Sequence, residues 1–464
     1  MTRPLPRVRY RIYGGPANYL RFARDLWLRR HRTHDLVAPF EAEVAAWFGA
    51  RHAVFTSLAR VAIHDVVRAW VPAGHGVVLS PYTIVDVVNM VVAAGAVPVF
   101  ADVDARTGNL DPDAAARAFD TASVPIAMIL VTHLHGVTAD LAALRTLAQA
   151  RGVRLVEDAA QALGAVIDGR RAGAAADAGV VSLGSYKNVN AHFGGVVLTD
   201  DDDLAATVRA ARDARPTFPL RHLLRKVRES LVTDLLGAHP FFGLVLFPVF
   251  RAALLRGWER INRLLRIELD TSLRPSVPAY MLGRPTDLQV RSARAQWTRI
   301  DADAAHRIHG ARRALDALSD HPDLLLPPPP DGLRHVYTYA AVQVVTPEDA
   351  TPDDARMLRA ELVRHLARQG RDVAPQHLHD VSGLPAFRRY GGACPVAARV
   401  AASVVLLPTY PGYDDAQVDA NVRALRAWRV TRRVTETACC SPSCSPATTR
   451  SSRTPAPPTS PAAV

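Results

Sequence analysis

Lysine is nearly absent from this chain of 464 residues. It occurs twice, at Lys187 and Lys226, and the other 54 of the 56 basic residues are arginine. Arginine keeps its proton in proteins, whereas lysine can lose one and attack a carbonyl group. Since the chain uses arginine almost everywhere that it needs a positive charge, each lysine is a candidate for chemistry that arginine cannot perform. The alternative is that the two lysines occur by chance, and the residues around each lysine must distinguish these explanations.

Cysteine is also scarce. The four cysteines are Cys394, Cys439, Cys440 and Cys444, and none accompanies a histidine cluster. This pattern does not indicate a disulfide framework or a zinc site, and it is typical of a protein from a reducing cytoplasm. The N-terminal segment lacks the apolar stretch of a secretory signal. We therefore expect a cytoplasmic protein without a metal site.

Positive charge is in excess, with a formal net charge of +12. Such a balance suits nucleic acid, a membrane surface or anionic small molecules as partners. The chain has no basic stripe interleaved with aromatic residues and no zinc-finger spacing, so we expect no nucleic-acid partner. Hydrophobic residues make up 49% and charged residues 22%, which is ordinary for a soluble globular protein long enough for two domains.

Short runs of Val, Ile and Leu alternate with helical stretches through the first half of the chain. This rhythm predicts a mostly parallel, buried sheet with helical crossovers, in which ligands bind at the carboxyl ends of the strands. A second, smaller α/β section follows a long helix. The expected organisation is a basic N-terminal arm (1–35), a large domain (36–213), an insertion (214–285), a smaller C-terminal domain (286–430) and a disordered tail (431–464).

The insertion contains an uncharged apolar stretch, LLGAHPFFGLVLFPVF (235–250), which arginines and Lys226 flank. A transmembrane helix needs about 20 apolar residues, and this stretch is shorter and holds two prolines. One interpretation is that it packs on the protein. The other is a peripheral contact with an anionic membrane surface, because basic flanks around a short apolar stretch suit such a contact.

A carboxylate stands at the end of one apolar run, in VRLVEDAAQALGA. Asp158 ends the run, and Gln161 follows three residues later. A carboxylate in this position can pair with a protonated ring nitrogen, the pairing that makes pyridoxal 5'-phosphate (PLP) an electron sink. An ordinary helix N-cap is the alternative.

Lys187 lies in a glycine-rich segment after the next run, in VVSLGSYKNVNAHFGG. Ser182 and Ser185 can donate hydrogen bonds to a phosphate, and Gly194 and Gly195 let backbone approach a flat ring closely. A partly desolvated lysine near other cations has a lowered pKa and becomes a nucleophile. A surface lysine in a loop is the alternative.

A helix is predicted to begin near residues 57–60, in AVFTSLARVAIHD. Its free backbone N–H groups make a phosphate site, to which Arg60 can add a charged contact. An ordinary helix start is the alternative.

Together these segments resemble the DegT/DnrJ/StrS family of PLP-dependent sugar aminotransferases. The similarity runs from about Pro39 to Leu425, broken by the insertion, and includes SPYTIVDVVNMVVAAGAVPVFADVD, LVTHLHGVTADL, VEDAAQALGA, SLGSYKN and LLPTYPGYDD. The resemblance implies a fold type I (aspartate aminotransferase-like) α/β enzyme, usually a homodimer. It further implies transfer of an amino group, commonly from glutamate, to a keto group on a nucleotide-linked sugar, in surface polysaccharide or secondary-metabolite biosynthesis.

The resemblance also implies roles for individual residues. Lys187 would bond covalently to PLP and move a proton between cofactor and substrate carbons. Asp158 would hold the ring nitrogen protonated, and Gln161 would contact the ring hydroxyl side. The phosphate would lie against Ser182, Ala59 and Arg60.

The sequence departs from the family at two points of this site. Many members have Ser-Gly-Thr in the phosphate turn, where this chain ends with Ala59 and Arg60. Many members also place an aromatic residue over the cofactor ring, where this chain has Ile84, with Tyr82 as the nearest aromatic residue. Both Ile84 and Tyr82 are therefore candidates for contact with PLP.

Two other classes of function compete with aminotransfer. Related sugar dehydratases replace the lysine with histidine, so Lys187 argues against that activity. The remaining alternative is a non-catalytic PLP-binding regulator or a membrane-surface scaffold of the same fold. The complete set of Lys187, Asp158, Gln161 and Ser182 favours the enzyme.

Overall fold

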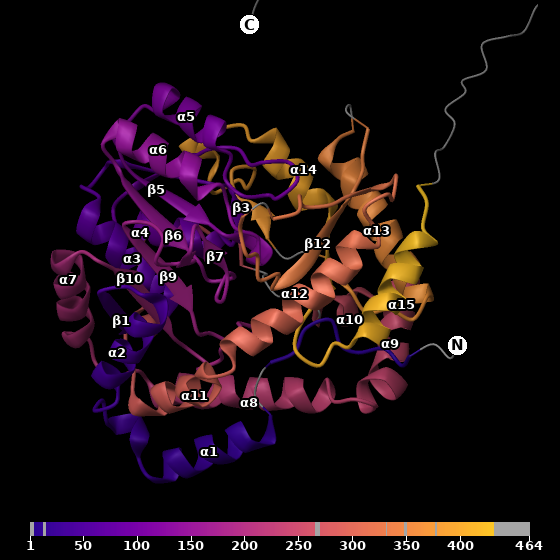
Figure 1. Cartoon of the computed structure of the whole chain (residues 1–464), viewed down its shortest axis with the longest axis horizontal. Coiled ribbons are helices and arrows are strands. Elements are labelled where there is room, and N and C mark those ends of the chain that lie inside the picture. The colour runs from indigo at the N-terminus through magenta and orange to yellow at the C-terminus, as the bar shows by residue number, and fades with distance from the viewer. Residues whose placement is uncertain are drawn as a thin grey trace, which may run out of the picture. The chain divides into compact units, whose positions relative to one another are not determined.

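A mostly parallel sheet forms the centre of the fold in the computed structural model, which describes residues 4–12, 15–264, 270–330, 332–347, 350–375 and 378–430. Among these residues, seven strands pair in the order β1-β10-β9-β6-β5-β2-β4 (Figure 1). The strands β4, β2, β5, β6 and β9 run parallel, and β10 is antiparallel to both β9 and β1. The bounds are β1 His52–Thr56, β2 Gly76–Leu79, β4 Val97–Phe100, β5 Ile126–Thr132, β6 Arg154–Asp158, β9 Ala178–Ser182 and β10 Gly195–Thr199.

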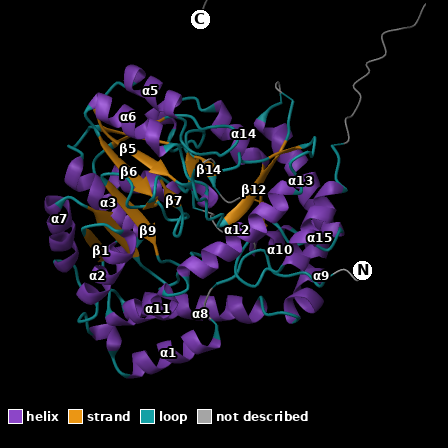
Figure 2. Ribbon diagram, viewed as in Figure 1, coloured by secondary structure: helices purple, strands orange, loops and turns teal. Residues whose placement is uncertain are grey.

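Helices cover both faces of this sheet, which explains why its strands are near-continuous apolar runs (Figure 2). The strands β2, β9 and β10 are buried at every residue. One core cluster joins the sheet to α2, α5 and α6, and another joins it to α3, α4 and α7. Their bounds are α2 Val37–Phe48, α3 Ala59–Trp70, α4 Val85–Ala93, α5 Pro112–Thr121, α6 Leu141–Arg151 and α7 Asp202–Asp213.

A second sheet follows in the C-terminal part of the chain, with the order β11-β12-β15-β13 in the described residues and antiparallel pairing throughout. Helices α12 to α15 accompany it. The bounds are β11 Leu324–Leu325, β12 Tyr339–Val344, β13 Ala374–Pro375, β15 Val404–Pro408, α12 Ile300–Asp316, α13 Pro352–Arg368, α14 Pro395–Ser403 and α15 Asp415–Arg426. Residues 1–429 form one compact unit, so the division into a large and a small domain stays a prediction, and the expected tail (431–464) lies outside the described residues.

The N-terminal arm contains an extended segment (4–12) that is fastened to the C-terminal part of the chain. The Arg9 guanidinium pairs with the Asp372 carboxylate at 2.6 Å. The Tyr410 hydroxyl donates to the carbonyl oxygen of Val8 at 2.9 Å, and the Gln417 side chain donates to that of Leu5 at 2.8 Å. Helix α1 (Pro16–Trp27) follows.

The insertion is helical over most of its described length. It contains α8 (Leu220–Leu236), the π-helix η3 (Phe242–Leu246), α9 (Phe247–Arg256) and α10 (Glu259–Leu264). Leu223 of α8 packs with Leu58 and Val61 at the start of α3. At the other end of the insertion, a Cβ placed on Gly243 would lie 2.8 Å from the carbonyl oxygen of Pro6, so η3 packs closely on the N-terminal arm.

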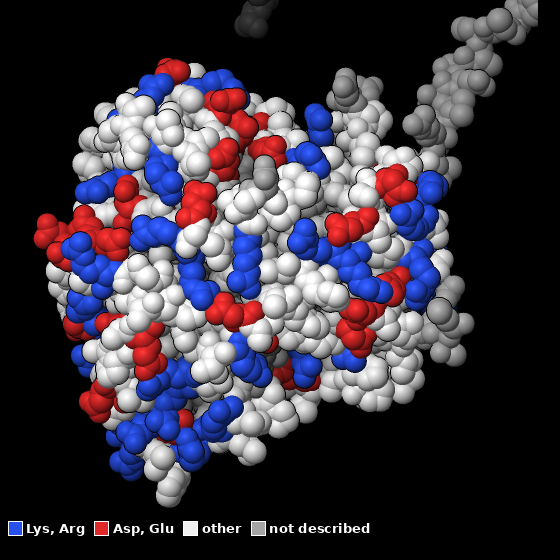
Figure 3. Space-filling model, in the orientation of Figure 1, with Lys and Arg blue, Asp and Glu red and all other residues white. Residues whose placement is uncertain are grey.

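The apolar stretch 235–250 is partly buried and partly exposed. Phe242 and Phe247 are buried, whereas Leu235 is 62% exposed and Leu244 is 59% exposed. Figure 3 shows an area without charged side chains over the right-hand end of α8 and α9. Packing on the protein therefore accounts for one side of the stretch only. None of the described helices has the length and apolar character to cross a bilayer.

Candidate active site

A cavity of about 410 Å³ lies at the carboxyl ends of β6 and β9. Its walls come from the turns after these two strands, the first turn of α3, the start of α4, the start of β12, and α8 of the insertion. The position matches the expectation that a ligand binds where parallel strands end.

Asp158 is the last residue of β6, and it is buried. One oxygen of its carboxylate accepts a hydrogen bond from the Ala160 N–H at 3.0 Å. Residues 159–165 are all described and form turns rather than a helix, so the helix-cap alternative is wrong. Burial raises the pKa of Asp158, while the Ala160 N–H and the Lys187 ammonium act to lower it. A buried carboxylate of this kind is stabilised by a cationic partner.

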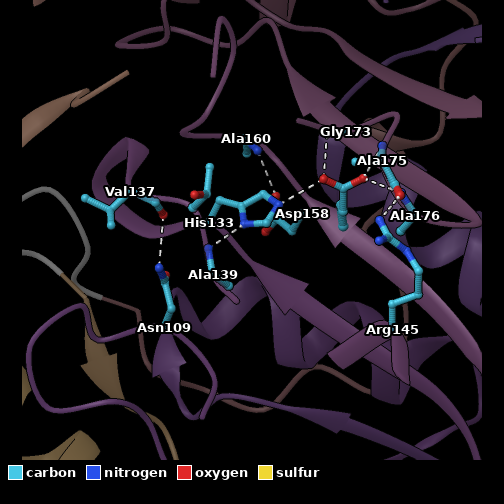
Figure 4. Close-up of polar contacts among 12 residues, drawn as sticks. Asn109, His133, Val137, Ala139, Arg145, Asp158, Ala160, Gly173, Ala175 and Ala176 are labelled. Carbon is cyan, nitrogen blue, oxygen red and sulfur yellow. Dashed lines mark hydrogen bonds and ion pairs between the residues drawn. The ribbon is translucent and has the colours of Figure 1, made fainter. Parts of the chain in front are cut away.

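A buried pair formed by His133 and Glu157, the residue before Asp158, fixes the end of β6 (Figure 4). The Glu157 carboxylate accepts hydrogen bonds from three backbone N–H groups of the turn 173–176, at 2.7 to 2.8 Å. The His133 Nδ1 accepts from the Ala139 N–H at 3.1 Å, so Nε2 carries the proton and donates to Glu157 at 2.9 Å. With its backbone held in this way, the strand end keeps Asp158 in one position.

Lys187 lies in the turn after β9 and lines the cavity together with Asp158. Its backbone N–H donates to the carbonyl oxygen of Gly184 at 3.3 Å. Burial lowers the pKa of the Lys187 ammonium, Asp158 acts to raise it, and Arg60 acts to lower it further. A lowered pKa increases the neutral fraction of the amine, which is the nucleophilic form. The fold thus brings the two central residues of the predicted site into one cavity.

The first turn of α3 also lines the cavity, through Ala59 and Arg60. Leu58 precedes the helix without a side-chain cap, so the first backbone N–H groups of α3 are available to an anion. Arg60 is less free than the sequence suggested, because its guanidinium forms an ion pair with Asp86 of α4. Arg274 also contacts Asp86, at 2.9 Å.

Ser182 and Gln161 both line the cavity. The Ser182 Oγ accepts a hydrogen bond from the Gly184 N–H at 3.4 Å. The Gln161 side-chain oxygen accepts one from the His135 N–H at 2.9 Å. Ser185 lines the cavity too, and its Oγ is buried with no hydrogen-bond partner among the described residues.

The two candidates for contact with the cofactor ring lie in different places. Ile84, the residue before α4, lines the cavity. Tyr82 is fully buried in the core, where its hydroxyl lies 3.2 Å from the Nε2 of His135. Because Tyr82 is not a wall residue of the cavity, the geometry favours Ile84.

Gly195 has a different task from the predicted one. A Cβ at this position would lie 2.3 Å from the Ala59 nitrogen, so glycine is required for β10 to pass the start of α3. Gly194 does line the cavity. The sequence predicted that Gly195 lets backbone approach a flat ring. In the structure it instead lets two backbone segments approach each other.

Several wall residues escaped the sequence reasoning. Thr338 and Tyr339 come from the second sheet, and burial raises the pKa of Tyr339 to about 12. His192 has a positive φ of 66°, and burial lowers its pKa to about 4. Lys226 comes from the insertion. Of these residues, Lys226 alone had a signal in the sequence, because lysine occurs only twice in this chain.

Known proteins resemble this chain in sequence and in fold. The sequence model of the DegT/DnrJ/EryC1/StrS aminotransferase family matches residues 26–215. The spore coat polysaccharide biosynthesis protein SpsC of Bacillus subtilis is 28% identical over 400 residues, or 84% of this chain and 88% of that protein. A dTDP-3-amino-3,4,6-trideoxy-alpha-D-glucose transaminase of Micromonospora megalomicea is 29% identical over 406 residues, with the same two shares, 84% and 88%.

Among solved structures, an aminotransferase from Psychrobacter cryohalolentis has a TM-score of 0.69 at 21% identity. The match covers 90% of this chain and 98% of that chain. The predicted fold class is thereby confirmed, with a mostly parallel central sheet and helices on both faces.

Proposed function

From the premise that this chain belongs to the DegT/DnrJ/EryC1/StrS aminotransferase family, we propose that its cavity binds PLP and that the enzyme aminates a keto-sugar. The amino group would come from glutamate, and the acceptor would be a nucleotide-linked sugar of surface polysaccharide or secondary-metabolite biosynthesis. One observation carries the proposal: Lys187 and Asp158 line a single cavity with the uncapped start of α3.

The residues of the cavity fit PLP. Asp158 is a buried carboxylate that gains from a cationic partner such as a protonated ring nitrogen. The buried Ser185 Oγ lacks a hydrogen-bond partner among the described residues, as expected for a group that meets a ligand. The start of α3 supplies free backbone N–H groups for a phosphate.

Each wall residue would then have a defined task. Ser182 and the N–H groups at Ala59 and Arg60 would hold the phosphate. Gln161 would lie at the ring hydroxyl, and Ile84 would provide the apolar wall against the ring. When bound, PLP supplies an electron sink for the substrate carbon.

The chemical work of the chain falls on two residues. The Asp158 carboxylate would hold a proton at the ring nitrogen, and its rigid strand end keeps it there through the reaction. The Lys187 amine would hold the cofactor covalently in the absence of substrate and, once an incoming amine has displaced it, would take up and return a proton at the substrate carbon. Its lowered pKa suits this work, because a general base is most effective when its pKa lies near the working pH.

Spectroscopy of the bound cofactor tests the proposal. Protein loaded with PLP should absorb in the visible range, and L-glutamate should convert the bound cofactor to its pyridoxamine form. A keto-sugar nucleotide should then restore the first spectrum. Protein that binds PLP and responds to no amino donor would instead support the non-catalytic alternative.

We also propose two partners of larger size. A homodimer is expected from the family, and sedimentation velocity would measure it. The exposed apolar side chains of 235–250, with arginines on both sides, would make a peripheral contact with the inner face of an anionic membrane. Leu235 and Leu244 are the most exposed large side chains of that stretch.

A further inference from the structure

Both lysines of this chain line the same cavity. They come from unrelated segments, since Lys187 follows a strand of the central sheet and Lys226 belongs to α8 of the insertion. The sequence had grouped Lys226 with the basic residues that flank the apolar stretch. In the structure its side chain instead belongs to the wall of the active-site cavity.

The packing of α8 explains why Lys226 lies there. Leu223 and Ser230 are buried on one side of the helix, and Leu223 belongs to the same buried apolar cluster as Leu58 and Val61 at the start of α3. Lys226 is three residues after Leu223 and four before Ser230, which places it on the same side of the helix. The insertion thus carries a cation to the cavity wall beside α3.

The charge of Lys226 is only partly compensated. Its Nζ lies 3.3 Å from the Glu229 carboxylate, which the neighbouring Arg225 also contacts, at 2.9 Å. One carboxylate therefore serves two cations. The two cations differ in setting, since the Lys226 side chain is 31% exposed and lines the cavity, whereas that of Arg225 is 71% exposed.

The other charged groups of the cavity have partners. Lys187 and Asp158 stabilise each other's charged forms, and Arg60 is paired with Asp86. Lys226 resembles Arg60 in one respect, because the carboxylate partner of each also pairs with a second cation, Arg225 at Glu229 and Arg274 at Asp86. Lys226 acts to lower the pKa of His192, whereas Arg60 acts to lower that of Lys187, so the two cations act on different parts of the cavity.

His192 adds a hydrogen-bonding group near Lys226. The ring is buried, lines the cavity and is held edge-on against Phe22, with ring centroids 5.4 Å apart. Its Nδ1 has no hydrogen-bond partner among the described residues. Burial, with a smaller contribution from Lys226, keeps the ring neutral at pH 7. A cation and an unpartnered ring nitrogen are together suited to an oxyanion that carries a hydroxyl or amide group nearby.

We propose that Lys226 binds an anionic group of the substrate, either the carboxylate of the amino donor or a phosphate of the sugar nucleotide, and that His192 lines the same subsite. The inference rests on the proposed function, which places substrate in this cavity. It assigns the insertion a part in substrate recognition, separate from the α3 start that would hold the cofactor phosphate.

The proposal is tested by measuring the affinities of the protein for PLP, L-glutamate and dTDP by calorimetry and absorbance. In Lys226→Met, the dissociation constant of L-glutamate or of dTDP should rise by about 10- to 100-fold, as for loss of a charged hydrogen bond. The affinity for PLP should stay within about threefold of wild type. Lys226→Arg keeps the charge and should recover most of the lost affinity.

Arg225→Met is the matched control, because it removes a cation of the same helix that contacts the same carboxylate from outside the cavity. It should leave the affinity for PLP unchanged and should weaken binding of the two anions far less than Lys226→Met does, because Lys226 keeps its charge. A loss for L-glutamate alone would identify the donor carboxylate as the anion, and a loss for dTDP alone would identify the nucleotide phosphate.

Unchanged affinity for both anions in Lys226→Met would overturn the proposal. The proposal would also be overturned if Lys226→Met bound PLP more weakly but bound pyridoxal, which lacks the phosphate, as tightly as wild type does. Lys226 would then hold the cofactor phosphate. Failure of wild-type protein to convert PLP with any donor would count against the proposed function only, since the calorimetric comparison of dTDP binding needs no turnover.

Discussion

Replacement of Asp158 by asparagine isolates the charge of the buried carboxylate from its shape. Asparagine has nearly the same size, and its side-chain oxygen can still accept the hydrogen bond from the Ala160 N–H. The neighbouring pair of Glu157 and His133 is untouched, so the end of β6 should stay in place. Asp158→Asn should therefore fold normally and still bind PLP through its phosphate.

The rate of aminotransfer should fall because the ring nitrogen loses a negative partner. The site is buried, where electrostatic interactions are stronger than in water. Loss of one such stabilising group costs about 3 kcal/mol, which corresponds to a factor of about 100 or more in rate. In the cofactor-free protein Lys187 would also lose the neighbour that raises its pKa, so the pH dependence of its reaction with added PLP, followed by absorbance, should shift to lower pH.

Stopped-flow measurement of a single turnover with L-glutamate gives the rate directly, and a pH titration of the absorbance gives the shift. Asp177→Asn is the control, since Asp177 accepts a backbone hydrogen bond from Leu155 at 2.9 Å and does not line the cavity. A rate within twofold of wild type in Asp158→Asn would refute the reasoning. So would equal losses in the two variants.

Three further predictions follow from the same geometry. Borohydride should fix PLP covalently to the wild-type chain and not to Lys187→Ala, as mass spectrometry of peptides would show; equal labelling of both would contradict the assignment. The double variant Leu235→Ser/Leu244→Ser should release the protein from anionic vesicles at low salt without loss of PLP, and unchanged co-sedimentation would end the membrane proposal. His335 is buried and its pKa is lowered to about 4. As pH falls, the unfolded chain therefore takes up a proton at this residue before the folded chain does. The contribution of His335 to the free energy of unfolding should therefore fall by about 3 kcal/mol as pH drops from about 6.5 to about 4. His335→Asn should make the profile of thermal denaturation less steep in this range, while the contribution of His192 stays; an unaltered profile would contradict it.

The sequence was sufficient to predict the large sheet and to bring Asp158 and Lys187 together at one cavity. Asp158 ends one apolar run and Lys187 follows another, and a parallel sheet brings the ends of such runs to one edge. Local pattern is therefore enough to place them together. The alternative of a helix cap at Asp158 was wrong because the chain continues in turns there, and periodicity does not distinguish a turn from a short helix.

The remaining wall residues depend on contacts between distant segments. Lys226 reaches the cavity because α8 packs across the start of α3, about 160 residues earlier in the chain. Tyr339 arrives from another sheet, and Asp86 takes up the charge of Arg60 from a neighbouring helix. The burial of Tyr82 likewise depends on tertiary packing around His135. Such placements are properties of the whole fold, so a single sequence does not contain a local signal for them.

The fastening of the N-terminal arm has a consequence for synthesis of the protein on the ribosome. Val8 and Arg9 leave the ribosome early, but their partners are made much later. Asp372, the partner of Arg9, follows it by 363 positions, and Tyr410, the partner of Val8, follows it by 402 positions. At typical elongation rates of about 5 to 20 residues per second, the arm waits roughly 20 to 80 seconds for them. The arm also packs on η3 next to Gly243, so the insertion that brings Lys226 to the cavity meets a fastened arm only when the C-terminal segment has been made. A nascent chain halted before Asp372 would thus hold the central sheet and both lysines, but with the insertion unsupported on that side.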